Sequence, residues 1–286
     1  MNDFIPKVIE KHLSPALVTS FKSIAGGCIN DTLKVSTTEG PYFLKWNRSS
    51  LYEMFRTEST GLNLLDELSP ISSPHVFGLG KIDDKSYLLT NWIEKGTPES
   101  GFWENFGKSL AIQHKESARL FGLDHNNFIG SLKQCNRQHT KWTDFFINER
   151  LAPQINLARS SNLIESSIQS KFDKLFQKLE NLIPTEKPSF LHGDLWSGNF
   201  MISDTGKAAI YDPAVHYGHR ETELAFTHLF GGFSPDFYKY YNEEYPIEPG
   251  FDDRIEIHNL YPLLVHVNLF GNSYLTGVIQ TLNRFT

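Results

Sequence analysis

Three polar residues are spaced so that together they can carry out chemistry on a phosphate. Asp194 and Asn199 lie in the segment SFLHGDLWSGNF (189–200), whose apolar flanks are too short for a helix, and Asp212 follows a predicted hairpin. Amide and carboxylate oxygens are the ligands that a hard cation such as Mg²⁺ prefers. A further carboxylate beside such a cation can accept the proton of an attacking hydroxyl. The spacing therefore predicts Asn199 and Asp212 as metal ligands and Asp194 as the catalytic base.

The same order of residues is that of phosphoryl-transfer enzymes of the protein-kinase type. Those enzymes hold the nucleotide phosphates with a lysine on the third strand of a small lobe, paired with a helix glutamate. Lys45 in YFLKW and Glu58 in the next predicted helix occupy these places. The turn at Gly26 and Gly27 leaves room for backbone N–H groups to approach a phosphate. We therefore expect these four residues to bind the nucleotide.

The elements that position these residues divide into two lobes. Strands are predicted at 19–24, 30–36, 42–46, 76–81 and 86–91, with a helix at 54–68. Longer helices are predicted at 102–117, 142–158, 164–182, 222–232, 235–242 and 251–282, and a hairpin joins 200–202 to 207–211. We expect an α+β, two-lobed protein-kinase-like fold. Residues 1–94 form a small antiparallel-sheet lobe, and residues 95–286 form a mostly helical lobe with the catalytic loop and the substrate site.

Composition excludes several other classes of protein. The 286 residues carry a net charge of -6, which gives no overall attraction to nucleic acid or to anionic membranes. The two cysteines, Cys28 and Cys135, are too few for a disulfide framework, and no apolar run has the length of a membrane span. We expect a cytoplasmic protein, monomeric or weakly dimeric, with no nucleic-acid or membrane partner.

Other polar residues near the predicted base have less specific signals. His192 is expected to brace the loop. Trp196 is expected either to pack on a sugar or cation or to belong to the core. Cys28 is expected to be a small turn residue, although its place beside Gly27 leaves oxidative control of nucleotide binding open.

The assembled motifs resemble the fructosamine/ketosamine-3-kinases, a family related to the aminoglycoside phosphotransferases. The resemblance lies in LHGDLWSGN (191–199), WTDFFINERLAPQI (142–155), YDPAVHYGHRETELAF (211–226) and LYPLLVHVNLFGNSY (260–274), among other segments, and covers nearly the whole chain. It implies ATP and Mg²⁺ as cofactors and transfer of the γ-phosphoryl group to the sugar 3-hydroxyl of a ketosamine, free or on a protein. It also implies that this phosphate labilises the adduct, which is a deglycation repair activity.

The resemblance also implies roles for further residues. The segment Asn91, Trp92, Ile93 and Glu94 is expected to hydrogen-bond adenine through its backbone. Trp196 and His219 are expected near the substrate. Glu221 and Glu223 are expected either to meet a substrate ammonium group or to be surface carboxylates. His219 is a departure, because the family often has YGDRE where this chain has YGHRE (217–221), and we expect the lost carboxylate to alter substrate charge preference.

Three alternatives stay open from the residues alone. The first is a phosphotransferase of the aminoglycoside or choline kinase type, which the pattern HGDxxxxN also fits. The second is a non-catalytic nucleotide-binding scaffold. The third is a metallohydrolase that uses His192, Asp194, Asp212, His216 and His219 as ligands.

Overall fold

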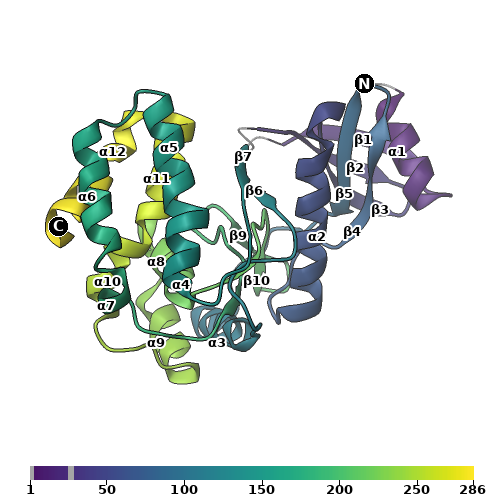
Figure 1. Cartoon of the computed structure of the whole chain (residues 1–286). Coiled ribbons are helices and arrows are strands. Elements are labelled where there is room, and N and C mark those ends of the chain that lie inside the picture. Colours follow the sequence, from purple (N-terminus) through teal and green to yellow (C-terminus); the bar gives the residue numbers. More distant parts are fainter. Residues whose placement is uncertain (1–2, 25–28) are drawn as a thin grey trace. The chain divides into compact units, whose positions relative to one another are not determined.

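The computed structural model describes residues 3–24 and 29–286 and has two compact units (Figure 1). The first unit comprises Met1–Phe102 with Phe200–Pro213, and the second comprises Trp103–Asn199 with Ala214–Thr286. The boundary between the lobes was expected after residue 94, whereas the first stretch of the first unit continues to Phe102. The hairpin at 200–213, expected in the helical lobe, belongs to the first unit. Backbone hydrogen bonds from Gly96 N to Ile202 O (2.9 Å) and from Asp204 N to Glu94 O (2.8 Å) attach it there.

The first unit is built on a five-stranded antiparallel sheet in the order β1-β2-β3-β5-β4. Its strands are β1 (Val18–Ser23), β2 (Asp31–Thr37), β3 (Gly40–Arg48), β4 (Val76–Ile82) and β5 (Lys85–Asn91), with the separate hairpin β9 (Phe200–Ile202) and β10 (Ala208–Ile210). Its helices are α1 (Phe4–Leu13), the short η1 (Ser49–Leu51) and α2 (Tyr52–Leu68). This is the predicted sheet lobe with one main helix, preceded by an amino-terminal helix.

The two faces of the sheet pack against different helices (Figure 1). Side chains alternate between the faces of a strand, so neighbouring residues point in opposite directions. Leu44 of β3 joins the apolar cluster of α1, whereas Leu88 of β5 joins that of α2 with Phe55 and Leu62. Lys45, next to Leu44 and paired in register with Leu88, therefore faces α2.

The second unit is mainly helical, and its main apolar core joins α4–α7 to α10–α12. Its helices are α3 (Phe102–Lys115), α4 (Trp142–Phe145), the π-helical turn η2 (Phe146–Leu151), α5 (Ala152–Ser160), α6 (Ser166–Phe176), α7 (Leu179–Leu182), α8 (Arg220–His228), η3 (Leu229–Gly231), α9 (Pro235–Glu244), α10 (Phe251–His258), α11 (Leu260–Phe270), η4 (Asn272–Tyr274) and α12 (Leu275–Phe285). Its strands are β6 (Asn127–Ile129), β7 (Leu132–Gln134), β8 (Ser189–Leu191) and β11 (His216–Gly218). Strands β8 and β11 pair antiparallel, and β8 leads directly into the loop that holds Asp194.

Three long predicted helices are divided in the structure, and the one predicted at 164–182 is α6 followed by α7. The helix predicted at 251–282 is three helices, because the chain turns at Asn259 and because Gly271 adopts φ 92°, a conformation that ends α11. The helix predicted at 142–158 contains the π-helical turn η2, which sequence periodicity does not reveal. Across the described residues, every helix is too short or too polar to span a bilayer.

Candidate active site

In the first unit, Lys45 contacts two carboxylates. Its Nζ lies 2.6 Å from Glu58 Oε1, and it also donates to the carboxylate of Asp212. Glu58 reaches the lysine because it shares a face of α2 with Phe55 and Leu62, three residues before it and four after it. The predicted pairing of Lys45 with a helix glutamate is confirmed. The contact with Asp212 was not predicted from the sequence.

Electrostatics keep Lys45 charged. Burial alone would lower the pKa of its ammonium group, but the charges and hydrogen bonds of Asp212 and Glu58 outweigh it and raise that pKa. The side chain of Asp212 remains 47% exposed, so part of its carboxylate is open to a further partner. Asp212 also has φ 58°, a left-handed conformation that is uncommon outside glycine and often marks a functional position.

The predicted adenine-binding segment follows β5. Asn91 uses its side-chain oxygen to accept from His75 N (2.7 Å), and the backbone oxygen of Glu94 accepts from Asp204 N. The Glu94 carboxylate accepts from Trp92 Nε1 (2.6 Å) and from Lys34 Nζ (3.0 Å). The role of Asn91, Trp92, Ile93 and Glu94 in binding adenine stays a prediction. Gly26, Gly27 and Cys28 lie outside the described residues.

In the second unit, Asp194 and Asn199 are held together in one loop. Asn199 Nδ2 donates both to the backbone oxygen of Asp194 (2.8 Å) and to its carboxylate Oδ2 (2.8 Å). This contact turns the Asn199 amide nitrogen toward Asp194, so the opposite side of the amide presents its oxygen. The loop passes close to the backbone of Ala214 at Gly193. Only glycine fits there, because its φ is 81° and an added Cβ would lie 2.1 Å from Ala214 O.

A buried carboxylate fixes the start of this loop. Glu223 of α8 accepts from the backbone N–H groups of His192 (3.1 Å) and Gly193 (2.6 Å), and His114 Nε2 lies 3.0 Å from its Oε1. Burial alone would raise the pKa of Glu223, but these hydrogen bonds and nearby imidazoles lower it. Sequence reasoning missed this role because Glu223 and the loop are about 30 residues apart, and no local pattern marks the contact.

His192 braces the loop, as expected. Its ring is fully buried, and its Nδ1 accepts from the backbone N–H of Asp194 (3.3 Å). Its backbone oxygen accepts from Ala214 N (2.9 Å), which joins the loop to the segment before β11.

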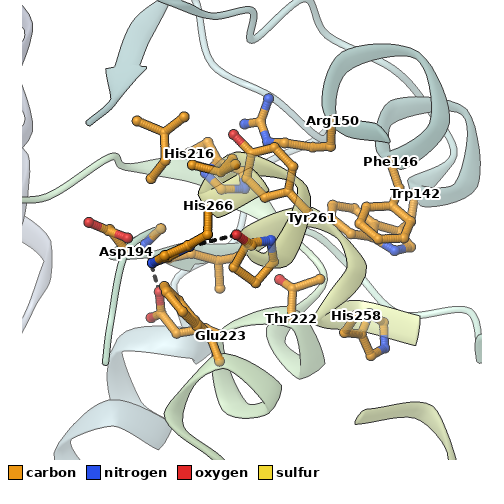
Figure 2. A pocket seen from close by; sticks show the side chains of 16 residues that line it. Trp142, Phe146, Arg150, Asp194, His216, Thr222, Glu223, His258, Tyr261 and His266 are labelled. Carbon is orange, nitrogen blue, oxygen red and sulfur yellow. Dashed lines mark hydrogen bonds between the residues drawn. The ribbon is translucent and has the colours of Figure 1, made fainter. Parts of the chain in front are cut away.

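A pocket lies in the second unit with Asp194 on its wall, and its empty space, open solvent included, is about 560 Å³ (Figure 2). Aromatic side chains make much of the lining, including Trp142, Phe146 and Tyr261. Such rings offer apolar faces to a sugar and can attract a cation. Arg150 and His216 also line it. Arg150 has no signal in the sequence, and His216 was singled out only as a ligand of the alternative metallohydrolase.

Trp196 lies in the same loop but does not line this pocket. Its ring packs across Gly198, whose added Cβ would lie 2.3 Å from it, and meets Phe230 edge-on at 6.0 Å between centroids. The side chain is partly exposed, so its predicted contact with substrate stays a prediction.

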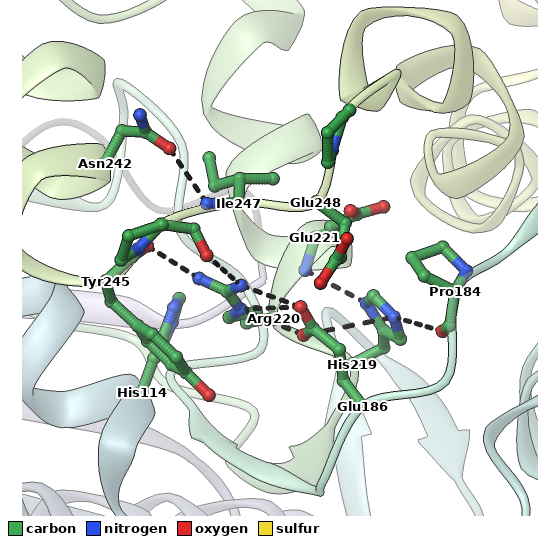
Figure 3. A network of polar contacts seen from close by, with 12 residues as sticks. His114, Pro184, Glu186, His219, Arg220, Glu221, Asn242, Tyr245, Ile247 and Glu248 are labelled. Atoms are coloured by element: carbon green, nitrogen blue, oxygen red, sulfur yellow. Dashed lines mark hydrogen bonds and ion pairs between the residues drawn. The ribbon is translucent and has the colours of Figure 1, made fainter.

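His219 and Glu221 lie within a network of polar contacts in the interior of the second unit (Figure 3). Both are fully buried, and Glu221 forms two hydrogen bonds with the Arg254 guanidinium, at 2.5 and 2.8 Å. His219 is the N-cap of α8, accepting from Glu221 N through Nδ1, with Nε2 3.0 Å from Pro184 O. A carboxylate at position 219 would cap the helix in the same way. The expected substrate contacts of His219 and Glu221, and the expected effect of position 219 on charge preference, do not fit this burial.

His219, Glu221 and His258 also form a cluster whose ligand atoms lie within 4.8 Å of one another. The Arg254 guanidinium already occupies both oxygens of Glu221 and would repel a metal ion. Glu221 has a pKa of about 2, because its hydrogen bonds to Arg254 and His258 outweigh the cost of burial. The cluster is therefore an internal ion pair, which gives no support to a metallohydrolase.

Comparisons with known proteins agree with these motifs. A family model described as fructosamine kinase matches residues 1–286. A probable ketoamine kinase of Lactiplantibacillus plantarum is 37% identical, with 94% of this chain and 95% of the relative covered. A chloroplastic protein-ribulosamine 3-kinase of Arabidopsis thaliana is 33% identical, with 94% and 83% covered.

Solved structures share the fold. The crystal structure of a putative fructosamine-3-kinase from Haemophilus somnus has a TM-score of 0.89 and 29% identity, covering 98% of this chain and 96% of that one. An aminoglycoside phosphotransferase in ternary complex with AMP-PNP and hygromycin B has a TM-score of 0.66 and 14% identity, covering 98% and 97%. The predicted protein-kinase-like fold, with an antiparallel-sheet lobe and a helical lobe, is confirmed.

Proposed function

The chain belongs to the fructosamine kinase family, and from this premise we propose that it transfers the γ-phosphoryl group of ATP to the 3-hydroxyl of a ketosamine. The observation that carries the proposal is the family match over residues 1–286. Relatives named ketoamine kinase and protein-ribulosamine 3-kinase over more than nine tenths of the chain support it further.

In this reaction Asp194 is the proton acceptor. The sugar hydroxyl oxygen bonds to the γ-phosphorus as the bond from that phosphorus to the β,γ-bridging oxygen breaks, and ADP leaves. The hydroxyl proton passes to the Asp194 carboxylate. The hydrogen bond from Asn199 to Oδ2 supports this role, because it orients the carboxylate.

Asn199 and Asp212 are the residues that would hold Mg²⁺. The donor set fits a hard cation: Asn199 presents its amide oxygen away from Asp194, and Asp212 keeps a partly exposed carboxylate. Bound Mg²⁺ neutralises charge on the nucleotide phosphates. Lys45, held by Glu58, adds a positive charge for the phosphates, and the segment 91–94 contacts adenine.

The product defines the biological role that we propose. A phosphate on the 3-hydroxyl makes the adduct labile and frees the amine, so the reaction reverses glycation. We place this activity in the cytoplasm, on small ketosamines or glycated protein amines.

An acceptor panel with ATP consumption as its readout tests the proposal. We expect turnover with ribulosamine and fructosamine adducts, and mass spectrometry should locate the new phosphate on the 3-oxygen. Turnover with an aminoglycoside or with choline instead would favour the related phosphotransferases. ATP binding without transfer to any acceptor would favour a non-catalytic scaffold.

A further inference from the structure

Phe230 has a backbone conformation that a bulky residue rarely adopts. Its φ is 57° and its ψ is 41°, in the left-handed region, inside the short turn η3 that follows α8. Among the described residues, the other non-glycine residues with a positive φ are Asp83, Asn162 and Asp212. Asp and Asn adopt this conformation several times more often than most side chains, whereas a bulky residue there is a strained outlier. Strained residues persist where the surrounding structure enforces them, and they cluster at functional sites.

Burial does not account for a phenylalanine at this position, because the residue is 37% exposed. The next two residues, Gly231 and Gly232, also have positive φ values, of 112° and 67°. A Cβ added to either glycine would meet no atom closer than 3.9 Å, so the turn requires its backbone angles and not a lack of side chains. Glycine or asparagine at position 230 would form the same turn with less strain. What phenylalanine adds there is its ring.

The ring and the backbone oxygen of Phe230 both contact the loop that holds Asp194 and Asn199. The ring meets the Trp196 ring edge-on, with 6.0 Å between the centroids. The backbone oxygen accepts a hydrogen bond from Ser197 Oγ (3.2 Å). Phe230 thus contacts two consecutive residues that lie between the proposed base and a proposed metal ligand.

Trp196 connects this contact to the catalytic side chains. Its backbone oxygen accepts from Asn199 N (2.9 Å), and its ring lies against Gly198, where an added Cβ would be 2.3 Å from it. Asn199 in turn donates to Asp194 Oδ2 (2.8 Å). A series of direct contacts therefore joins Phe230 to the Asp194 carboxylate.

The Phe230 ring is itself held by helices of the second unit. Its centroid lies 4.8 Å from that of His266 and 6.3 Å from that of Phe226, and both of these residues line the pocket that contains Asp194 (Figure 2). The Tyr274 ring meets it edge-on at 6.1 Å. The described residues that line the pocket do not include Phe230. Any effect of Phe230 on the reaction therefore passes through its neighbours.

We propose that Phe230 is a positioning residue: its ring and its backbone oxygen hold residues 196–198, which fixes Asn199 beside the Asp194 carboxylate. The left-handed conformation directs the ring and the oxygen of one residue to two neighbouring residues of the loop. The kinetic consequence of this inference rests on the proposed phosphoryl transfer. Its consequence for the order of the loop does not depend on the reaction.

The variant Phe230→Asn tests the ring alone, because asparagine adopts the left-handed conformation readily. Phe270→Asn is the matched control. Phe270 is 55% exposed, and its ring also packs against His266 (5.5 Å) and Tyr274 (6.2 Å), but its ring contacts within the described residues do not include Trp196. Both variants therefore remove a phenylalanine ring from the same aromatic cluster, and only Phe230→Asn releases the loop.

Hydrogen–deuterium exchange followed by mass spectrometry measures the loop directly. We expect the amides of residues 195–199 to exchange about tenfold faster in Phe230→Asn than in the wild type, since the hydrogen bond from Asn199 N to Trp196 O opens more often. Phe270→Asn should exchange there at the wild-type rate. Equal rates in all three proteins would overturn the inference.

Turnover of a ketosamine measures the effect on the reaction. We expect kcat to fall by about 10- to 100-fold in Phe230→Asn with little change in ATP affinity, because misplacing a catalytic group by about an ångström has this cost. Phe230→Tyr keeps the ring and should keep most of the turnover, and Phe270→Asn should keep the wild-type kcat. A fall of the same size in Phe270→Asn would overturn the inference. Absence of turnover in the wild type would instead remove the proposed function, and the exchange rates would still decide the inference.

Ser197→Ala covers the case in which Phe230→Asn does not fold. It removes the hydroxyl that bonds to Phe230 O and leaves the ring in place. We expect a smaller fall in kcat, of about two- to tenfold, together with faster exchange at residues 195–199. Wild-type kcat and wild-type exchange in Ser197→Ala would then overturn the inference.

Discussion

Asp194 and Asn199 form a unit in which one side chain orients the other. Both hydrogen bonds of the Asn199 amide nitrogen end on Asp194, on its backbone oxygen and on its carboxylate. The free rotation that a surface aspartate has is thereby removed. The loop therefore presents a carboxylate in one orientation and an amide oxygen in another.

Replacement of Asp194 by Asn removes the proposed proton acceptor and keeps the size of the side chain. We expect kcat with a ketosamine to fall by roughly 10²- to 10⁴-fold. Thermal unfolding and ATP affinity should change little, since the change retains a polar side chain in the loop. Turnover close to that of the wild type would remove Asp194 from the role of base.

The ion pair of Lys45 with Glu58 stabilises the first unit, and we propose that Lys45 also binds the nucleotide. Lys45→Met leaves Glu58 without its cation, so we expect a loss of about 3 kcal/mol in the free energy of unfolding, typical of breaking a buried pair. ATP affinity should also fall. The double variant Lys45→Met, Glu58→Leu separates the effects: urea denaturation should show recovered stability, while ATP binding stays weak. Recovery of ATP binding in the double variant would contradict a phosphate-binding role for Lys45.

At the scale of elements, the strand β8 and the loop after it depend on one glycine. Gly193→Ala combines a positive φ with a Cβ that would lie 2.1 Å from Ala214 O, so the loop must move. We expect turnover to fall at least tenfold, because misplacing a catalytic group by about an ångström is that costly. Gly271→Ala is the matched control: its φ is also positive, but no atom lies within 4 Å of the added Cβ. It should lose about 1 to 3 kcal/mol of stability and keep its turnover per folded molecule. Equal turnover in both variants would mean that the approach to Ala214 is not needed.

The cap of α8 makes stability depend on pH. The pKa of His219 is lowered from 6.5 to about 4, because burial and the nearby His258 disfavour its charged form. Between these values the unfolded chain binds a proton that the folded chain does not, so stability falls as pH falls through this window. The contribution is about 3 kcal/mol between pH 7 and pH 4, at about 1.4 kcal/mol per pKa unit.

His219→Asn keeps an acceptor for Glu221 N and removes the titrating ring. We expect urea denaturation to show a smaller loss of stability between pH 7 and pH 4 than in the wild type. The exposed His75→Asn serves as the control and should retain the wild-type loss. A loss in His219→Asn equal to that of the wild type would show that His219 does not titrate in this window.

Elements whose sequence signals lie within a few residues of one another could be predicted from local patterns. The residue order typical of protein-kinase-type phosphotransferases paired Lys45 of the third strand with Glu58 of the next helix, and their ion pair is confirmed. The breaks in 251–282 were not predicted, because Gly271 is compatible with a helical pattern until its φ is known.

Contacts between distant segments could not be predicted in the same way. In the sequence, Glu223 is one of several carboxylates in a predicted helix. The pairing of β8 with β11 brings α8 to the loop after β8, where Glu223 contacts Gly193 N. For this reason the burial of His219 and Glu221 also escaped prediction.

At the scale of the whole molecule, the chain forms its first unit from two separate stretches. A fragment of residues 1–102 alone lacks β9 and β10. It therefore also lacks the backbone hydrogen bonds from Glu99 N to Gly206 O (3.0 Å) and from Ile210 N to Ser72 O (2.9 Å). We expect the fragment 1–102 to be less stable than the same fragment joined to 200–213. A short glycine-serine linker suffices, because the rings of Phe102 and Phe200 stack 6.4 Å apart. Urea unfolding followed by circular dichroism compares the two, and equal midpoints would show that the hairpin adds nothing.

Glu223 has a consequence for anions in the surrounding solution. Successive backbone N–H groups in a tight turn commonly form a nest that captures phosphate or sulfate. Here the N–H groups of His192 and Gly193 are occupied by the carboxylate of Glu223, and that of Asp194 by the His192 ring. The loop thus contains its own anion, and inorganic phosphate finds no vacancy at those three amides.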